Sequence, residues 1–133
     1  LALQWDDLNL RTGTLRVERQ GEQTLSLLQQ EPLMAVANCV SGCGIAFAAM
    51  FLEALADGAV KHGIPRADAY RMVSQMVAGT GKLQLVTGQH PGVMKDAVCS
   101  PGGTTIVGVA ELEHKGLRGA VIAAVDAVQN KPA

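Results

Sequence analysis

The chain has 133 residues, of which 48% are hydrophobic, 3% aromatic and 17% charged, and its net charge is −1. This length fits one domain, and the apolar but aromatic-poor composition favours closely packed helices over a β-sandwich. The absence of a net positive charge or of a Lys/Arg run argues against nucleic-acid binding by electrostatics. Three cysteines are too few for a disulfide framework, and LALQWDD at the start is not a targeting segment, so we expect a cytoplasmic protein.

Residues 1–32 differ in pattern from the rest of the chain. LNLRTGTLRVERQ holds a Thr-Gly turn and alternates apolar with charged residues from Leu15 to Glu18, which predicts a β-hairpin. A connector follows and is closed by Pro32, a residue suited to the first turn of a helix. We therefore expect an N-terminal hairpin and connector over 1–32, of different origin from a helical domain over 33–131.

The first predicted helices are apolar and meet at a glycine-containing segment. Residues 33–40 form a short helix, Ser41-Gly42-Cys43-Gly44 breaks it, and 45–62 form a long helix that is apolar nearly all round. Such a helix is expected inside a bundle or a subunit interface. Glu53 and Asp57 interrupt its apolar run, so the uncharged part is too short to span a bilayer. These two acids mark either a polar contact across a dimer or a solvated edge.

Three more helices are expected after this one. Pro65 starts a helix that Gly88 ends, and one or two helical turns are possible within 93–98. Helices over 104–115 and 117–130 complete an all-α fold. The core stripe of the helix after Pro65 is predicted to be Ala69, Met72, Val73, Met76, Val77, Thr80 and Leu83.

The least generic stretch is HPGVMKDAVCSPGGTTI, over 90–106. Its second half predicts a tight loop that ends at a helix N-terminus, where unpaired backbone N–H groups and the helix dipole favour an anion. Gly102 and Gly103 let a ligand approach the backbone, and Thr104 and Thr105 bring hydroxyls that can cap the helix or touch the ligand. The residues alone favour a Gly-rich loop with a Thr cap and no ligand, and a carboxylate or phosphate site is the alternative.

The remaining candidate residues carry simpler interpretations. Cys39 and Cys43 lie four residues apart, but no further ligand is near in sequence, so we expect small buried hydrophobic groups and no metal site. Cys99, next to the loop, is expected to be a packed thiol, with an oxidisable thiol as the alternative. His90 is expected to anchor the loop rather than transfer protons.

The helical part, 33–131, resembles the C-terminal domain of pyrroline-5-carboxylate reductase. The resemblance is carried by FLEALADGAVKHGIPRADAY and by GTGKLQLVTGQHPGVMKDAVCSPGGTTIVGVAELEHKGLRGAVIAAV, and above all by HPG-x-x-KD-x-V-x-SPGGTTI. It implies a helical bundle that forms a homodimer or higher homo-oligomer through interleaved helices. In the complete enzyme, the resemblance implies reduction of 1-pyrroline-5-carboxylate to proline with NAD(P)H, which an upstream Rossmann domain binds.

The resemblance also implies roles for the residues of the loop. Thr105 matches the family's proposed proton donor, which contacts the pyrroline nitrogen, so it is the candidate catalytic residue. The substrate carboxylate is implied to be held at the candidate anion site, which consists of Ser100, Gly102, Gly103, Thr104 and Thr105. A Thr hydroxyl is a poor acid, so a proton relay there needs water or orientation rather than a shifted pKa.

Two departures from the family limit what the resemblance implies. The 133 residues contain no strand-GxGxxG-helix unit, so this chain alone is expected to bind no nicotinamide cofactor and to be inactive. The family's SGSGPAY is SGCGIAF here, with Ile45 in place of the Pro that starts the long helix. Loss of that Pro would let the helices over 33–40 and 45–62 run together.

Two further hypotheses compete with the reductase interpretation. The chain could be a non-catalytic helical oligomerisation module, recombined or designed, that keeps only the fold. Alternatively, LALQWDDLNLRTGTLRVERQ resembles the strand pair that follows the first catalytic Arg in tyrosine recombinases of the phage-integrase type. No His-x-x-Arg box or nucleophilic Tyr segment follows it, so the resemblance implies no recombinase chemistry and no basic patch supports DNA binding.

Overall fold

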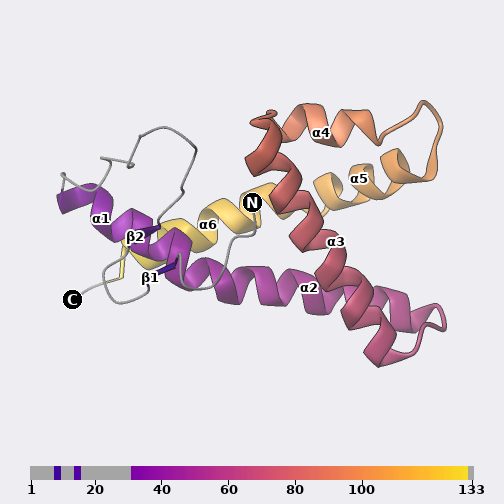
Figure 1. Cartoon of the computed structure of the whole chain (residues 1–133), viewed down its shortest axis with the longest axis horizontal. Helices are drawn as coiled ribbons and strands as arrows, with labels where there is room; N and C mark the ends of the chain where they lie inside the picture. The colour runs from indigo at the N-terminus through magenta and orange to yellow at the C-terminus, as the bar shows by residue number, and fades with distance from the viewer. Residues whose placement is uncertain (1–7, 10–13, 16–30, 132–133) are drawn as a thin grey trace. The chain divides into compact units, whose positions relative to one another are not determined.

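The computed structural model describes residues 8–9, 14–15 and 31–131 (Figure 1). Apart from two short strands, the elements that these residues form are helices, which confirms the all-α class. The chain divides into two compact units, Leu1–Ala48 with Val121–Ala133, and Ala49–Ala120. Each unit is described by itself below.

The first unit contains the N-terminal strands. β1 (Leu8–Asn9) pairs antiparallel with β2 (Thr14–Leu15), in agreement with the predicted hairpin. The remaining residues before 31, and with them the predicted connector, lie outside the described residues. The domain boundary at residue 32 and the recombinase resemblance therefore stay predictions.

The predicted break at 41–44 is wrong, because the chain stays helical there. α1 (Glu31–Asn38) passes through the π-helical segment η3 (Cys39–Cys43) into α2 (Gly44–Lys61). Gly44 has helical angles, φ −55° and ψ −28°, and its N–H donates to the carbonyl of Cys39 in the i→i+5 pattern of a π-helix. The glycines weaken the helix without ending it, and Ile45, unlike a Pro, keeps the N–H and avoids the ring clash that end helices.

The continuous helix is longer than the apolar run considered in the sequence. Leu33–Lys61 spans 29 residues and is long and apolar enough, by length and composition alone, to cross a membrane. The core helix of a soluble protein and a signal sequence meet the same two criteria. The expectation that the chain does not contact a membrane stays a prediction.

The second unit is built on the hairpin of α2 and α3 (Arg66–Thr87). Gly63 has φ +99° in the turn between them, a conformation that favours glycine. Asp57 forms an ion pair with Arg66, whose guanidinium lies 5.5 Å from the centre of the Tyr70 ring. The hydrogen bond to Asp57 raises the pKa of Arg66 above its ordinary value. Asp57 therefore has a partner within the chain, on the exposed side of the hairpin.

A small apolar core lies between α2 and α3. Ala56 of α2 and Ala69 of α3 are fully buried, and Val73 is 7% exposed. Partly buried apolar residues surround them, among them Leu52 and Val77. Small side chains at the crossing let the two helices approach closely.

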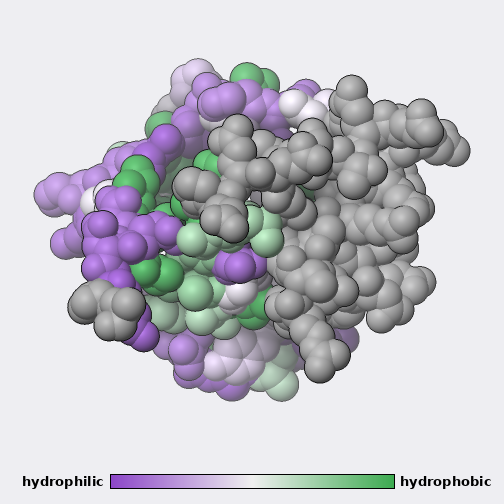
Figure 2. Space-filling model, turned by 90° about the vertical axis from the view of Figure 1, so that its left-hand side faces the viewer, coloured by the Kyte–Doolittle hydropathy of each residue, from purple (hydrophilic) through white to green (hydrophobic). Residues whose placement is uncertain are grey.

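Most of the predicted core is nevertheless at the surface of the single chain. Within the described residues, the buried hydrophobic residues are Cys39, Ala56, Ala69 and Val73. The predicted stripe is thus right at Ala69, Val73 and the partly buried Val77. It is wrong at Thr80, which is exposed, and at Met72, Met76 and Leu83, which are 59%, 44% and 50% exposed. Figure 2 shows hydrophobic side chains at the surface among hydrophilic ones. One copy of the chain leaves a large apolar area in contact with solvent.

The remaining helices agree with the sequence to within a few residues. They are α4 (Pro91–Ala97), α5 (Thr104–His114) and α6 (Leu117–Gln129). Gly88 and Gly116 have φ +64° and +74° after α3 and α5, as expected for glycines that end helices.

Candidate anion site at the start of α5

The candidate site is the connection from α4 to α5, and the carbonyl groups at the end of α4 fix its first residues. The N–H of Val98 donates to the carbonyl of Lys95 at 3.2 Å, and the N–H of Cys99 donates to that of Asp96 at 3.0 Å. Ser100 follows directly. Backbone hydrogen bonds to α4 therefore fix the position of the residues that precede Ser100.

The four residues from Ser100 to Gly103 form a tight turn. The N–H of Gly103 donates to the carbonyl of Ser100 at 3.0 Å, and Gly102 has φ +68°, a conformation that L side chains rarely adopt. At Gly103 a Cβ would meet the side-chain oxygen of Ser100. Both glycines are thus needed for local reasons, one for its backbone angle and the other for the space that the Ser100 hydroxyl fills.

The turn ends at an open helix N-terminus. Gly103 is the N-cap residue of α5, with φ −75° and ψ 168°, and it makes no side-chain cap. In an α-helix the first-turn N–H groups, here those of Thr104, Thr105 and Ile106, have no carbonyl partner within the helix. The Thr cap that the sequence allowed is not formed, because both Thr lie inside the helix. The donors of the first turn are left for another acceptor.

The electrostatics of this end suit an anion. The first turn of α5 has no acidic residue, and the positive end of the helix dipole lies there. Thr104 and Thr105 are exposed, and Gly103 is half-buried. The structure therefore brings together the backbone groups and hydroxyls of all five predicted residues within one turn and the helix start that follows.

A cation near the site is already paired. The ammonium of Lys95 on α4 contacts the carboxylate of Asp96, and this hydrogen bond raises the pKa of Lys95 above its ordinary value. The remaining positive character at the site comes from the backbone of α5. A small carboxylate fits such a site better than a ligand that requires several free lysines or arginines.

Cys39 and Cys43 lie in the π-helical segment η3 and are not residues of this site. Cys39 is buried in η3, in agreement with the packing interpretation, and Cys43 is half-buried. Within the part of the chain that the structure describes, no group of three His, Cys, Asp or Glu side chains is placed to hold a metal. The Gly42–Gly44 run is helical, so it does not form the phosphate-binding turn of a dinucleotide site.

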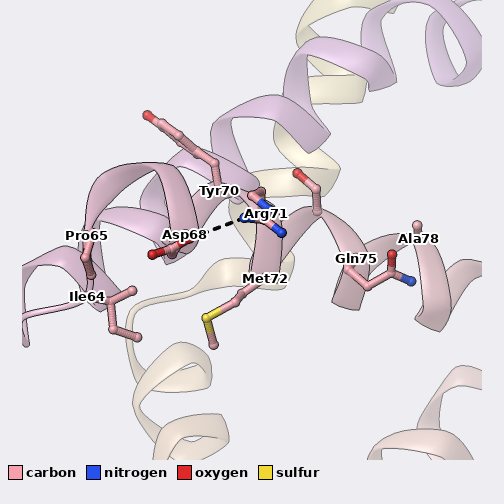
Figure 3. Close-up of a pocket in the computed structure, with 9 residues that line it drawn as sticks. Ile64, Pro65, Asp68, Tyr70, Arg71, Met72, Gln75 and Ala78 are labelled. Carbon is pink, nitrogen blue, oxygen red and sulfur yellow. Dashed lines mark ion pairs between the residues drawn. The ribbon is translucent and has the colours of Figure 1, made fainter.

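A shallow concave surface, which the sequence did not indicate, lies at the start of α3 (Figure 3). Asp68 and Arg71 form an ion pair of 3.5 Å there, one helical turn apart and exposed. No residue of the candidate anion site lines it. Most residues that line this surface belong to α3 alone. The N-terminus of α5, with its free first-turn N–H groups, remains the stronger candidate site.

Residues 31–133 match the protein family described as pyrroline-5-carboxylate reductase dimerisation. Pyrroline-5-carboxylate reductase of Escherichia coli strain K12 is 52% identical over 101 residues, covering 76% of this chain and 38% of that protein. The enzyme of Treponema pallidum is 53% identical over 93 residues, which cover 70% of this chain and 35% of the relative. This chain thus spans little more than a third of the length of these relatives.

Solved structures agree with the sequence comparison. A 1-pyrroline-5-carboxylate reductase from Streptococcus pyogenes superposes with a TM-score of 0.74 and 39% identity, covering 76% of this chain and 39% of that one. The Plasmodium falciparum enzyme, solved with NADP bound, gives a TM-score of 0.72 and 35% identity, over 75% and 38% of the two chains. The helical order, the Ser100–Gly103 turn and these matches lead to one conclusion. The chain belongs to the pyrroline-5-carboxylate reductase family.

Proposed function

We propose that residues 33–131 are the substrate-binding and dimerisation part of a reductase that converts 1-pyrroline-5-carboxylate to proline. The observation that carries this proposal is the open N-terminus of α5 behind the Ser100–Gly103 turn. A carboxylate placed there can accept hydrogen bonds from the first-turn N–H groups and from the Ser100 hydroxyl. The family to which the chain belongs supports this choice of ligand.

In this proposal Thr105 faces the ring nitrogen of the substrate. With the carboxylate at the helix start, a hydroxyl in the first turn lies on the same side as the adjoining imine. The hydroxyl can donate a hydrogen bond to that nitrogen and orient it, or pass on a proton from water. Because an alcohol is a weak acid, we assign Thr105 to orientation and relay rather than to direct acid catalysis.

The nicotinamide cofactor supplies the hydride to the C=N carbon when it is bound in the complete enzyme. Both Gly-x-Gly runs among the described residues before the site, Gly42–Gly44 and Gly79–Gly81, are helical, so neither forms the phosphate-binding turn of a dinucleotide site. This chain's share of the reaction is to bind the carboxylate and to orient the nitrogen. That the chain alone takes no cofactor and does not turn over stays a prediction.

The apolar surface supports the dimerisation half of the proposal. Exposed apolar residues occur on α2, α3, α5 and α6, and include Met50, Met72, Val107 and Ile122, which are 59–69% exposed. A stable single chain rarely leaves such an area in water, so we propose that a second copy covers it. We place this homo-oligomer in the cytoplasm.

Amide NMR of the chain during titration with L-proline tests the ligand proposal. We expect shift changes concentrated in Ser100–Ile106, and a clear loss of affinity in Thr105→Val, which removes the hydroxyl and keeps the side-chain shape. Thr80→Val is the matched control, because the Thr80 hydroxyl donates only within α3, to the carbonyl of Met76 at 2.9 Å. An absence of shifts at millimolar proline would contradict the proposal.

A second candidate function is a helical oligomerisation module without catalysis. The same exposed apolar helices favour it, because self-association needs no ligand site. It predicts a stable oligomer whose Ser100–Ile106 amides do not respond to proline. The titration therefore separates the two candidates.

A further inference from the structure

His90 is the N-cap residue of α4 and closes that helix with its ring. Its Nδ1 accepts a hydrogen bond from the N–H of Gly92 at 3.0 Å. Pro91 fills the first helical position, where a missing N–H costs nothing and its fixed φ suits the helix. A Cβ at Gly92 would lie 3.0 Å from Nδ1 and 3.3 Å from Cε1 of His90. The His-Pro-Gly order is thus explained by an imidazole cap that needs a glycine beneath it.

An imidazole is an unusual cap because protonation of its acceptor nitrogen removes the hydrogen-bond acceptor. Nδ1 accepts a hydrogen bond only while it carries no proton, and in the imidazolium ion both ring nitrogens are donors. Protonation would set one N–H against that of Gly92 and place a positive charge at the positive end of the α4 dipole. Ordinary caps, with Ser, Thr, Asn or Asp, do not change in this way near neutral pH.

We propose that His90 is a proton-operated clamp on α4, which orders the Ser100–Gly103 turn when the ring is neutral and loosens it when the ring is protonated. α4 has only seven residues, so losing its N-terminal contact weakens the whole helix. The carbonyl groups of Lys95 and Asp96 near its other end hold the N–H groups of Val98 and Cys99. Fraying of α4 therefore reaches the residue before Ser100.

The residues next to His90 on α3 are uncharged, and the charged residues of α4 pair with each other. On the side of α3, the neighbours are uncharged, since Gln84 donates to the carbonyl of Gln89 at 3.5 Å and the N–H of Gln89 donates to Thr87 at 3.2 Å. Lys82 is the last charged residue of α3. On α4, Lys95 and Asp96 pair with each other.

The charged groups that follow the turn are also engaged. Glu111 of α5 pairs with His114 and Lys115, and Glu113 pairs with Arg118. Among the residues that the structure describes, no ion pair involves His90. The contact of the His90 ring on which the clamp depends is therefore its hydrogen bond with the N–H of Gly92.

The consequence for ligand binding rests on the proposed function. If a carboxylate binds at the start of α5, the clamp makes its affinity fall as the pH drops through the titration of His90. Asn in place of His90 supplies an oxygen acceptor that does not titrate, and Ala supplies none. These two variants separate the loss of a cap from the effect of a proton.

Amide NMR over about pH 5 to 8, the range in which histidines commonly titrate, tests the clamp without any ligand. In the unmodified chain we expect the amide shifts of Gly92 and Gly103 to follow the titration of the His90 ring. Amide exchange in α4 should become about fivefold faster on the acid side, as expected for one lost N-cap contact. His90→Asn should remove both pH dependences, and His90→Ala should exchange fast at all pH values.

A Gly103 shift that is independent of the His90 titration, or unchanged pH dependence in His90→Asn, would overturn the proposal. Titration with L-proline at about pH 8, the basic end of that range, is run on the same samples. Lack of binding there would count against the proposed ligand and leave the clamp result standing. The two proposals can therefore fail separately.

Discussion

The side-chain oxygen of Ser100 lies in the space that a Cβ at Gly103 would occupy. The same two residues are joined by the backbone hydrogen bond of 3.0 Å that closes the turn. The hydroxyl is thus held next to the N-cap of α5, beside the free N–H groups of its first turn. This contact explains why the turn needs a glycine at a position whose backbone angles, φ −75° and ψ 168°, any residue can adopt.

Gly103→Ala is expected to destabilise the chain by about 1–3 kcal/mol, the usual cost of forcing a methyl group into filled space. Ser100→Ala removes the oxygen in question, so the double variant should recover about 1 kcal/mol of that loss. Denaturant unfolding of the four proteins measures the coupling. Equal costs of Gly103→Ala in both backgrounds would show that the contact is not the cause.

Asp96→Asn is expected to lower the pKa of Lys95. The hydrogen bond to Asp96 raises that pKa, so the pair stabilises the folded state below the unfolded pKa of the lysine. This contribution is lost as the pH rises through the higher, folded value, on the alkaline side. NMR of the lysine side chains should show Lys95 alone titrating earlier in the variant, and an unchanged Lys95 titration would refute the assignment.

Ile45→Pro is expected to end the helix at Gly44 and restore the break that the sequence first suggested. The ring removes the N–H and clashes with the carbonyl of Ser41, one turn earlier. NMR secondary shifts across 41–46 measure the effect, with Ile45→Ala as the control that keeps the N–H. Continuous helical shifts in the Pro variant would contradict this explanation of η3.

Met50→Glu is expected to weaken self-association at least tenfold. Met50 is 69% exposed in one chain, and a charge there would have to be buried without a partner when a second copy covers α2. Gln89→Glu, at an exposed position between α3 and α4, introduces the same charge outside the helices that carry the apolar surface. Concentration-dependent sedimentation compares the two, and equal dissociation constants would exclude α2 from the interface.

The helices and their ends were largely predictable because they depend on local chemistry. Pro65, Gly88 and Gly116 mark boundaries through fixed or positive φ angles, and the structure places a helix start or end beside each of them. α4 starts at Pro91, two residues before the helical turns that the sequence suggested. The tight turn and the helix start after it were likewise predictable, since both depend on one short stretch of sequence. That the five residues form a site stays a prediction. Their ligand and roles stay proposals.

Three features could not be predicted from local pattern. The π-helical segment at Cys39–Cys43 depends on two opposing effects, the weakening of the helix by Gly42 and Gly44 and the stabilisation by the hydrogen bonds of a long helix. The filling of the Gly103 space by Ser100 depends on a turn geometry that spacing does not define. The exposure of Met72 and Met76 arises because helical periodicity indicates an apolar side without indicating whether the same chain or another covers it.

Sedimentation equilibrium of the unmodified chain tests most directly whether these helices form one half of a shared core. We predict a dimer or a larger homo-oligomer at micromolar concentration, because the described part of one chain buries little beyond Cys39, Ala56, Ala69 and Val73. Circular dichroism on the same sample should report a helical protein. A well-folded, helical monomer that persists as the concentration rises would contradict the account.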